Sequence, residues 1–263
     1  MLRLNGITEE RALDNEEFTR DLLRQVLLKS APEDREARQS FHESAGQLSL
    51  KLGLLSYALE RDATEVIRLF EGAAKHLVPA LALREPPDPD THRSPWEAEQ
   101  FINVIVCFGE GSSALETIAQ LKTGQYRNPL RKEHEALDQY LKVLLKFLGG
   151  GTIDVPALER VIAACEAAKA TKDDRLFLLP SARGLTAIAA EDEDQWNYSI
   201  ARLLSAHGQE ARKGDLKLLP DGLVSFRAMM LAKLGIDNEM ECRAESDYLP
   251  LFLLEEDGED DEE

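Results

Sequence analysis

The feature of this sequence that most constrains its fold is the recurrence of apolar residues at helical spacing along most of its length. The clearest case is the segment 33–61, where one face of a predicted helix carries Phe41, Ala45, Leu48, Leu52, Leu55 and Leu59. Residues three or four apart share a helix face, so this pattern predicts an amphipathic helix. The alternation of β-branched and polar residues that is typical of strands is absent. We therefore expect an all-α fold, either an irregular multi-helix bundle or a solenoid-like stack of helical hairpins.

Local start and stop signals place further helices. Asp14, with Glu17 three residues later, forms a capping box ahead of an apolar stripe that begins at Phe18. Asp62 is placed to cap the next helix. That helix should end near Pro79 or shortly after it, because proline lacks the amide hydrogen that a helix interior uses.

The helix predicted at 94–108 is apolar on several sides. Ser94 provides a capping oxygen, Pro95 fits the first turn, and Glu97 completes a capping box. We expect this helix to be central, because a helix without a broad polar face must be covered all round.

The strongest loop signal is the segment 85–93, which contains three prolines in four consecutive positions. Proline-rich connections between helices need not separate domains, so we interpret 85–93 as a weak subdivision within a single all-α domain of residues 1–254. The segment 255–263 holds eight acidic residues and is predicted to be a disordered acidic tail.

The charge of the chain points to one class of partner. The formal net charge is −18, and removing the eight acids of the tail still leaves −10. Such a protein repels nucleic acid and anionic membranes and attracts basic proteins. No apolar run reaches the length of a membrane span, and the N-terminal segment turns acidic at once instead of forming a signal core. We expect a cytoplasmic protein that binds neither nucleic acid nor membrane.

No catalytic or cofactor-binding motif is recognisable in the sequence, including GxSxG, a P-loop or HExxH. The three cysteines, Cys107, Cys165 and Cys242, are far apart and odd in number, which predicts reduced thiols and no zinc site. His134 and Asp138 would share a helix face, for which a solvated face is the simplest interpretation. We expect no cofactor, no metal and no enzymatic activity. A shielded pocket of converging ionisable groups would argue against this.

The C-terminal stretch Leu219–Leu254 combines a helix, an extended return and a final apolar segment. Asp221 is placed to cap the helix, and Gly235 is placed to end it in a left-handed conformation. Three residues near the end are expected to lie in the core and to hold the C-terminus down: Tyr248, Leu249 and Leu253.

The same stretch contains five short groups of residues that occur together. They are Asp221-Gly222-Leu223, Leu231-Ala232, Gly235-Ile236, Ser246-Asp247-Tyr248-Leu249-Pro250 and Leu253-Leu254. This combination resembles the C-terminal signature of the immunity protein 49 family. The resemblance implies an all-α protein encoded beside a bacterial polymorphic toxin, acting as a cytoplasmic antidote that binds and blocks that toxin. It implies no catalytic residues.

Two hypotheses of function follow. The first is an immunity protein that binds a cognate toxin domain and occludes its active site with an acidic helical surface. In this hypothesis the toxin domain is basic, and one version of the hypothesis makes it a nuclease. We place the contact at an acidic edge formed by Glu191, Asp192, Glu193 and Asp194, together with Asp247. Acids at 191–194 also suit the first turn of a helix that contains Trp196. The alternative is a helical-repeat scaffold or adaptor that binds a peptide or a basic protein. Neither hypothesis predicts an oligomeric state.

Overall fold

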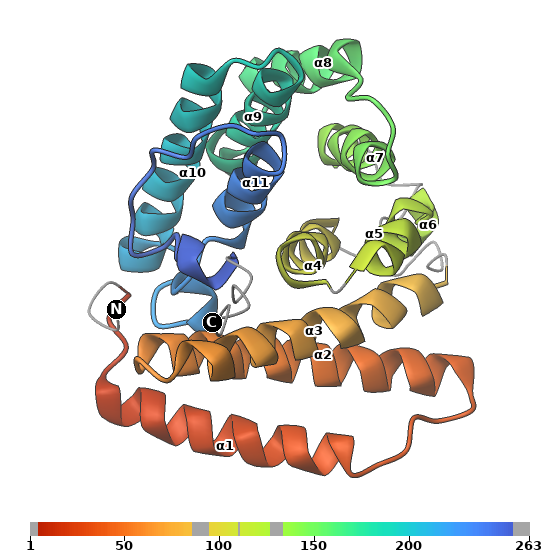
Figure 1. The fold of residues 1–263 in the computed structure, drawn as a ribbon, viewed down its shortest axis with the longest axis vertical. Coiled ribbons are helices and arrows are strands. Elements are labelled where there is room, and N and C mark those ends of the chain that lie inside the picture. The colour runs from red at the N-terminus through yellow and green to blue at the C-terminus, as the bar shows by residue number, and fades with distance from the viewer. Residues whose placement is uncertain (1–4, 86–94, 110, 127–133, 255–263) are drawn as a thin grey trace, which may run out of the picture.

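The computed structural model describes residues 5–85, 95–109, 111–126 and 134–254 (Figure 1). Within these ranges the chain forms helices and no strand, so the all-α prediction is confirmed. None of the helices described is long and apolar enough to cross a membrane. The tail 255–263, the cap Ser94 and the segment 85–93 apart from Glu85 lie outside the described residues. The subdivision at 85–93, the single domain 1–254 and the disordered tail therefore stay predictions.

The described residues form eleven α-helices and three shorter helical turns. The α-helices are α1 (Glu9–Leu27), α2 (Arg35–Ala58), α3 (Ala63–Leu83), α4 (Pro95–Phe108), α5 (Gly111–Ala119), α6 (Thr123–Tyr126), α7 (Glu135–Leu148), α8 (Val155–Glu166), α9 (Leu179–Ala189), α10 (Glu193–Lys213) and α11 (Phe226–Ile236). A π-helical turn, η2 (Asp174–Leu178), precedes α9, and the 3-10 turns are η3 (Pro220–Gly222) and η4 (Leu251–Leu254). Helices α1 to α3 form a layer across the lower part of Figure 1, and α7 to α11 stand over it.

Helix α4 is covered on all sides, as its sequence predicts. Eleven of its fourteen residues are buried. It packs against α3 on one side and against α11 on another. The rings of Phe70, Phe108 and Phe226 meet where these three helices join, with centroids 4.9 Å and 5.3 Å from that of Phe70. Because α11 packs on a helix far from it in sequence, the fold is an irregular bundle and not a solenoid of neighbouring hairpins.

Helices α2 and α3 form the most extensive helix pair, and two glycines allow their close approach. A Cβ atom at Gly46 would lie 2.7 Å from the side chain of Leu77, and one at Gly53 would lie 2.6 Å from the ring of Phe70. Helix α3 continues through Pro79 and ends at Leu83, which agrees with the predicted end near Pro79 or shortly after it. A proline removes only one helical hydrogen bond, and buried residues after Pro79 hold the last turn in the core. The predicted cap Asp62 is confirmed, since its side chain accepts the amide of Glu65.

Helix α1 begins earlier than predicted and buries a different face. Thr8 caps the helix through a hydrogen bond from the amide of Arg11 at 3.3 Å, so the capping box predicted at Asp14 is wrong. Phe18 is 60% exposed, so the predicted stripe does not form the packing face. The residues of α1 that are buried are Ala12, Glu16, Thr19 and Leu23.

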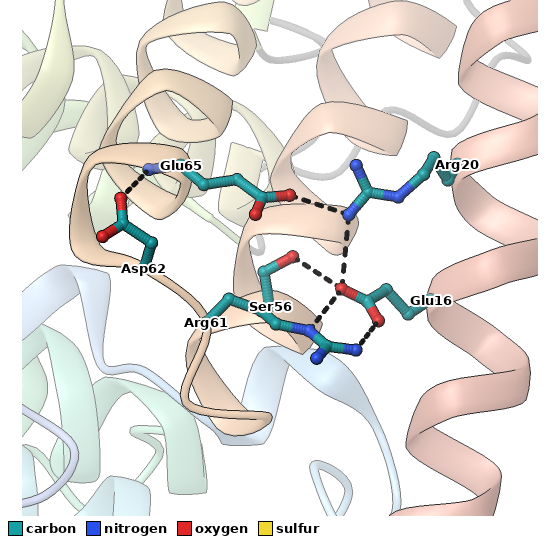
Figure 2. Close-up of polar contacts among 6 residues, drawn as sticks. All are labelled: Glu16, Arg20, Ser56, Arg61, Asp62 and Glu65. Atoms are coloured by element: carbon teal, nitrogen blue, oxygen red, sulfur yellow. Dashed lines mark hydrogen bonds and ion pairs between the residues drawn. The ribbon is translucent and has the colours of Figure 1, made fainter.

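A polar network holds α1 against the α2–α3 pair (Figure 2). The buried carboxylate of Glu16 accepts hydrogen bonds from Arg61 at 2.7 Å and 3.2 Å and from Ser56 at 3.2 Å. Arg20 lies between this carboxylate, at 3.3 Å, and that of Glu65, at 2.8 Å. Burial opposes the ionised form of Glu16, but Arg61 and the other donors outweigh it, so the pKa of Glu16 lies below its ordinary value. The buried face of α1 is therefore anchored by charge as well as by apolar contact.

Helix α11 starts later than predicted, and Gly235 is not the residue that ends it. It begins at Phe226, and Asp221 lies in the preceding 3-10 turn, so the predicted cap is wrong. Gly235 lies inside the helix and not in a left-handed conformation, which occurs instead at Glu239 with φ 65°. A glycine is needed at position 235 for space, because a Cβ atom there would collide with the buried ring of Trp196.

We expect Gly235→Ala to lower the free energy of unfolding by about 1–3 kcal/mol, the usual cost of overpacking a core. Gly72→Ala on α3 is the matched control, because a Cβ atom there would meet only the Ser49 hydroxyl, 3.9 Å away. Alanine favours the helix over glycine, so this variant should keep or gain about 0.5–1 kcal/mol. Urea unfolding followed by circular dichroism measures both, and equal losses would contradict the steric explanation.

Candidate functional site

The acidic edge lies at the N-terminal end of α10. Asp192 caps the helix, accepting the amide hydrogen of Gln195 at 3.0 Å. Glu193 and Asp194 occupy the first turn, where carboxylates interact favourably with the helix dipole, as predicted. Glu191 precedes the cap with φ 54°. Glu191, Asp192 and Asp194 are exposed, so these carboxylates are available to a partner.

The segment that follows α11 returns along α10 and neutralises part of this edge. The guanidinium of Arg243 lies 2.6 Å from Asp194 and 3.2 Å from Glu193. The amide of Arg243 donates to the side-chain oxygen of Asn197 at 2.7 Å, which fixes the returning backbone on the helix. The acidic edge therefore carries less net charge than its four acids suggest. The sequence does not show this, because Arg243 is remote from the edge along the chain.

Asp247 is exposed but lies toward the other end of α10, so the structure does not bring it together with the acidic edge. The neighbouring Tyr248 packs against Gly208. From Glu193 to Gly208 a helix rises about 22 Å at 1.5 Å per residue. Tyr248, Leu249 and Leu253 are buried at 5%, 5% and 3% exposure, which confirms that they hold the C-terminus in the core.

A second candidate site, which no sequence motif indicated, is a cavity of about 360 Å³ between α4 and the start of α11. This volume lies in the range of sites that bind small molecules or partner side chains. The side chain of Glu97, which also lines the cavity, is 40% exposed, so the cavity reaches the protein surface. Its other principal polar lining residues are Glu99, Gln100, Asn103, His207, Asp221 and Arg227.

A buried ion pair forms one wall of the cavity. Arg227 donates from Nε and Nη2 to the two oxygens of Glu99 at 2.6 Å and 2.5 Å, the bidentate geometry that favours strong pairing. Asn103 donates its amide hydrogen to Glu99 at 2.9 Å. The guanidinium also lies over the rings of Trp96 and Phe177, 5.2 Å and 4.8 Å from their centroids. Both oxygens of Glu99 are therefore engaged.

His207 and Asp221 are the ionisable lining groups that form no ion pair with described residues. Burial lowers the pKa of His207 to about 4, so the ring is neutral at pH 7, and its Nε2 lies 3.2 Å from the carbonyl oxygen of Gly222, to which it donates. The carboxylate of Asp221 accepts a hydrogen bond from Gln100 at 3.0 Å. Burial raises the pKa of Asp221.

Two of the ionisable groups that line the cavity are engaged within the protein, since Glu99 is paired with Arg227 and Nε2 of His207 donates to Gly222. Asp221, which forms no ion pair with described residues, is the lining carboxylate that keeps an unengaged lone pair. Among the described residues no group of three or more His, Cys, Asp or Glu side chains could hold a metal ion.

The expected solvated face at His134 and Asp138 is wrong for Asp138, which is buried and accepts a hydrogen bond from Lys142 at 2.9 Å. Cys107 and Cys165 are buried free thiols.

The buried His207 should make stability depend on pH. Its pKa is lowered from 6.5 to about 4 in the folded protein, so the unfolded chain binds the proton first as the pH falls. The contribution of neutral His207 to the free energy of unfolding is therefore complete above pH 6.5. As the pH falls to 4, the free energy of unfolding decreases by roughly 3 kcal/mol on account of this residue. We expect His207→Gln to show a shallower loss of unfolding free energy between pH 7 and pH 4. Parallel curves for the two proteins in urea titrations would contradict this.

One comparison with known proteins gave a match, over a part of the chain that includes the cavity residues from α10 and α11. Residues 111–253 match the family model described as Immunity protein 49. The matched segment is slightly more than half of the chain and includes all but the last residue of the groups that carry the sequence resemblance. Asp221 and Arg227 lie inside it, whereas α4 lies outside. Neither the curated proteins nor the solved structures gave a match. The chain belongs to the immunity protein 49 family.

Proposed function

We propose that this chain is an immunity protein that binds the toxin domain encoded beside its own gene and covers the active site of that toxin. The observation that carries the proposal is the family match over residues 111–253. The all-α fold supports it, because a tightly packed helical surface can bind without an ordering cost.

The charge of the chain favours a basic toxin. A net charge of −18 attracts a positively charged partner over long range and speeds their encounter. A nuclease domain carries a positive cleft for its substrate, so it is the kind of toxin that fits this charge best. On the acidic edge, Glu191 and Asp192 form no ion pair within the described ranges, so they would supply much of the local attraction.

Co-expression with the adjacent toxin gene tests the proposal. We expect growth to be rescued, and the purified chain to form a stable complex with a catalytically inactivated toxin domain. Growth arrest at full strength in the presence of this chain, or the absence of a complex between the purified proteins, would refute the proposal.

The rate of association should fall with salt. The Debye length shrinks from about 10 Å at 0.1 M to about 3 Å at 1 M, and steered association slows accordingly, here by about tenfold or more. Stopped-flow fluorescence with the inactivated toxin domain measures this rate. A flat profile would rule out electrostatic steering and leave inhibition itself intact.

The variant Glu191→Gln/Asp192→Asn tests whether the acidic edge takes part. Asparagine caps helices as well as aspartate does, so the fold of α10 should be preserved. We expect slower association at low salt, by about two- to fivefold, with little change in dissociation. Glu17→Gln/Glu159→Gln, which also removes two exposed carboxylates, one on α1 and one on α8, is the control. Equal effects of the edge variant and the control would show that only total charge matters.

A further inference from the structure

We infer that the cavity between α4 and α11 receives a lysine or arginine side chain of the toxin domain, and that Asp221 is its ionic partner. This inference rests on the proposed function, because it names the contact by which the partner is held. It locates the tight part of the interface away from the acidic edge, on groups that the sequence did not bring together.

The charges of the cavity leave one lining carboxylate, that of Asp221, without an ion-pair partner among the described residues. The carboxylate of Glu99 is neutralised by Arg227, and that of Glu97 by Arg84 at 2.9 Å. Asp221 accepts hydrogen bonds from neutral groups, the side-chain amide of Gln100 and its own backbone amide, and it forms no ion pair with any described residue. A partly buried carboxylate without a cation is unfavourable, and a cation from a partner would remove that cost.

The internal cation whose charge acts on Asp221 does not fill this role. Lys51 on α2 favours the ionised form of Asp221 through its charge, but it is the smallest of the influences on that carboxyl and makes no ion pair with it. The apolar surroundings outweigh it, since the pKa of Asp221 is raised by burial overall. The cavity is therefore open to a stronger cation.

The amide of Asn103 supports the same occupant independently. This side chain lines the cavity, is 2% exposed and donates its amide hydrogen to Glu99. Its oxygen has no hydrogen-bond partner among the described residues. Buried amide oxygens nearly always have one. The carboxylate of Asp221, which has no cation, fits an ammonium or guanidinium group and not an anion. The enclosed oxygen of Asn103 favours the same choice through its negative partial charge, without itself facing open space.

The remaining walls of the cavity suit the stem of such a side chain. Leu216, Val224 and Phe226 provide apolar surface. Lysine and arginine carry an aliphatic stem below a charged head, so one side chain can use both this apolar surface and the carboxylate of Asp221. Arg227 does not repel the incoming head strongly, because Glu99 balances its charge at bidentate distance.

The test is the affinity of Asp221→Asn for the inactivated toxin domain, measured by isothermal titration calorimetry. We expect the dissociation constant to rise by about 10- to 100-fold, because the partner cation would lose its counter-charge in a buried site. The melting temperature of the free variant should stay the same or rise, because an uncompensated buried charge has been removed. Glu159→Gln should change neither quantity.

The outcomes separate this inference from the proposed function. If the wild-type chain binds the toxin and Asp221→Asn binds equally well, the inference is wrong and the proposed function stands. If the wild-type chain neither binds nor protects, the proposed function fails and the inference with it. A lower melting temperature accompanying weaker binding would assign Asp221 a structural role and overturn the inference.

A double-mutant cycle identifies the partner residue and adds a second readout. Each lysine and arginine on the toxin surface is replaced by methionine and paired with Asp221→Asn. We expect one toxin position whose effect on the dissociation constant largely disappears in the Asp221→Asn background. Additive effects at every position would contradict the inference.

Discussion

The ion pair between Glu99 and Arg227 is the contact on which the centre of the structure depends. Helix α4 is surrounded by other helices, so the carboxylate of Glu99, at 1% exposure, can be accommodated only if another element delivers a cation. Arg227 does this from the first turn of α11, and two aromatic rings enclose its guanidinium. Removing either partner would leave the other charge buried. The pair therefore fixes α11 on α4 and, with it, the shape of the cavity.

The features that sequence could predict are those decided within a few residues. Asp62 caps a helix because the amide that it accepts lies three residues ahead, and α4 is central because its own residues leave no polar face. Asp221 and Gly235 also match local signals, for a cap and a stop, yet they serve other purposes. Their roles are set by Gln100 and Trp196, which are distant in sequence.

The candidate site also combines features that the sequence could predict with features that depend on distant residues. The exposure of the acidic edge followed from its place in a helix start, but its partial neutralisation depends on Arg243, and its separation from Asp247 depends on the path of the returning segment. The cavity could not be predicted at all, since it combines α4, α10 and the approach to α11. Glu16 on α1 shows the same limit, because a buried carboxylate breaks the apolar pattern that would mark a packing face.

The two parts of the candidate surface differ in how they would act on a partner. Exposed carboxylates at the acidic edge act through long-range attraction, which changes association more than dissociation. A partly buried carboxylate in a cavity acts only on contact, where water is excluded and a matched cation is held more strongly. Helix α10 links the two, because its first turn carries the edge and His207 lines the cavity. The helix rises about 21 Å between those points, a span that one interface of standard size, roughly 800 Å² per partner, can cover. A single toxin domain could therefore be attracted by one end of α10 and held at the other.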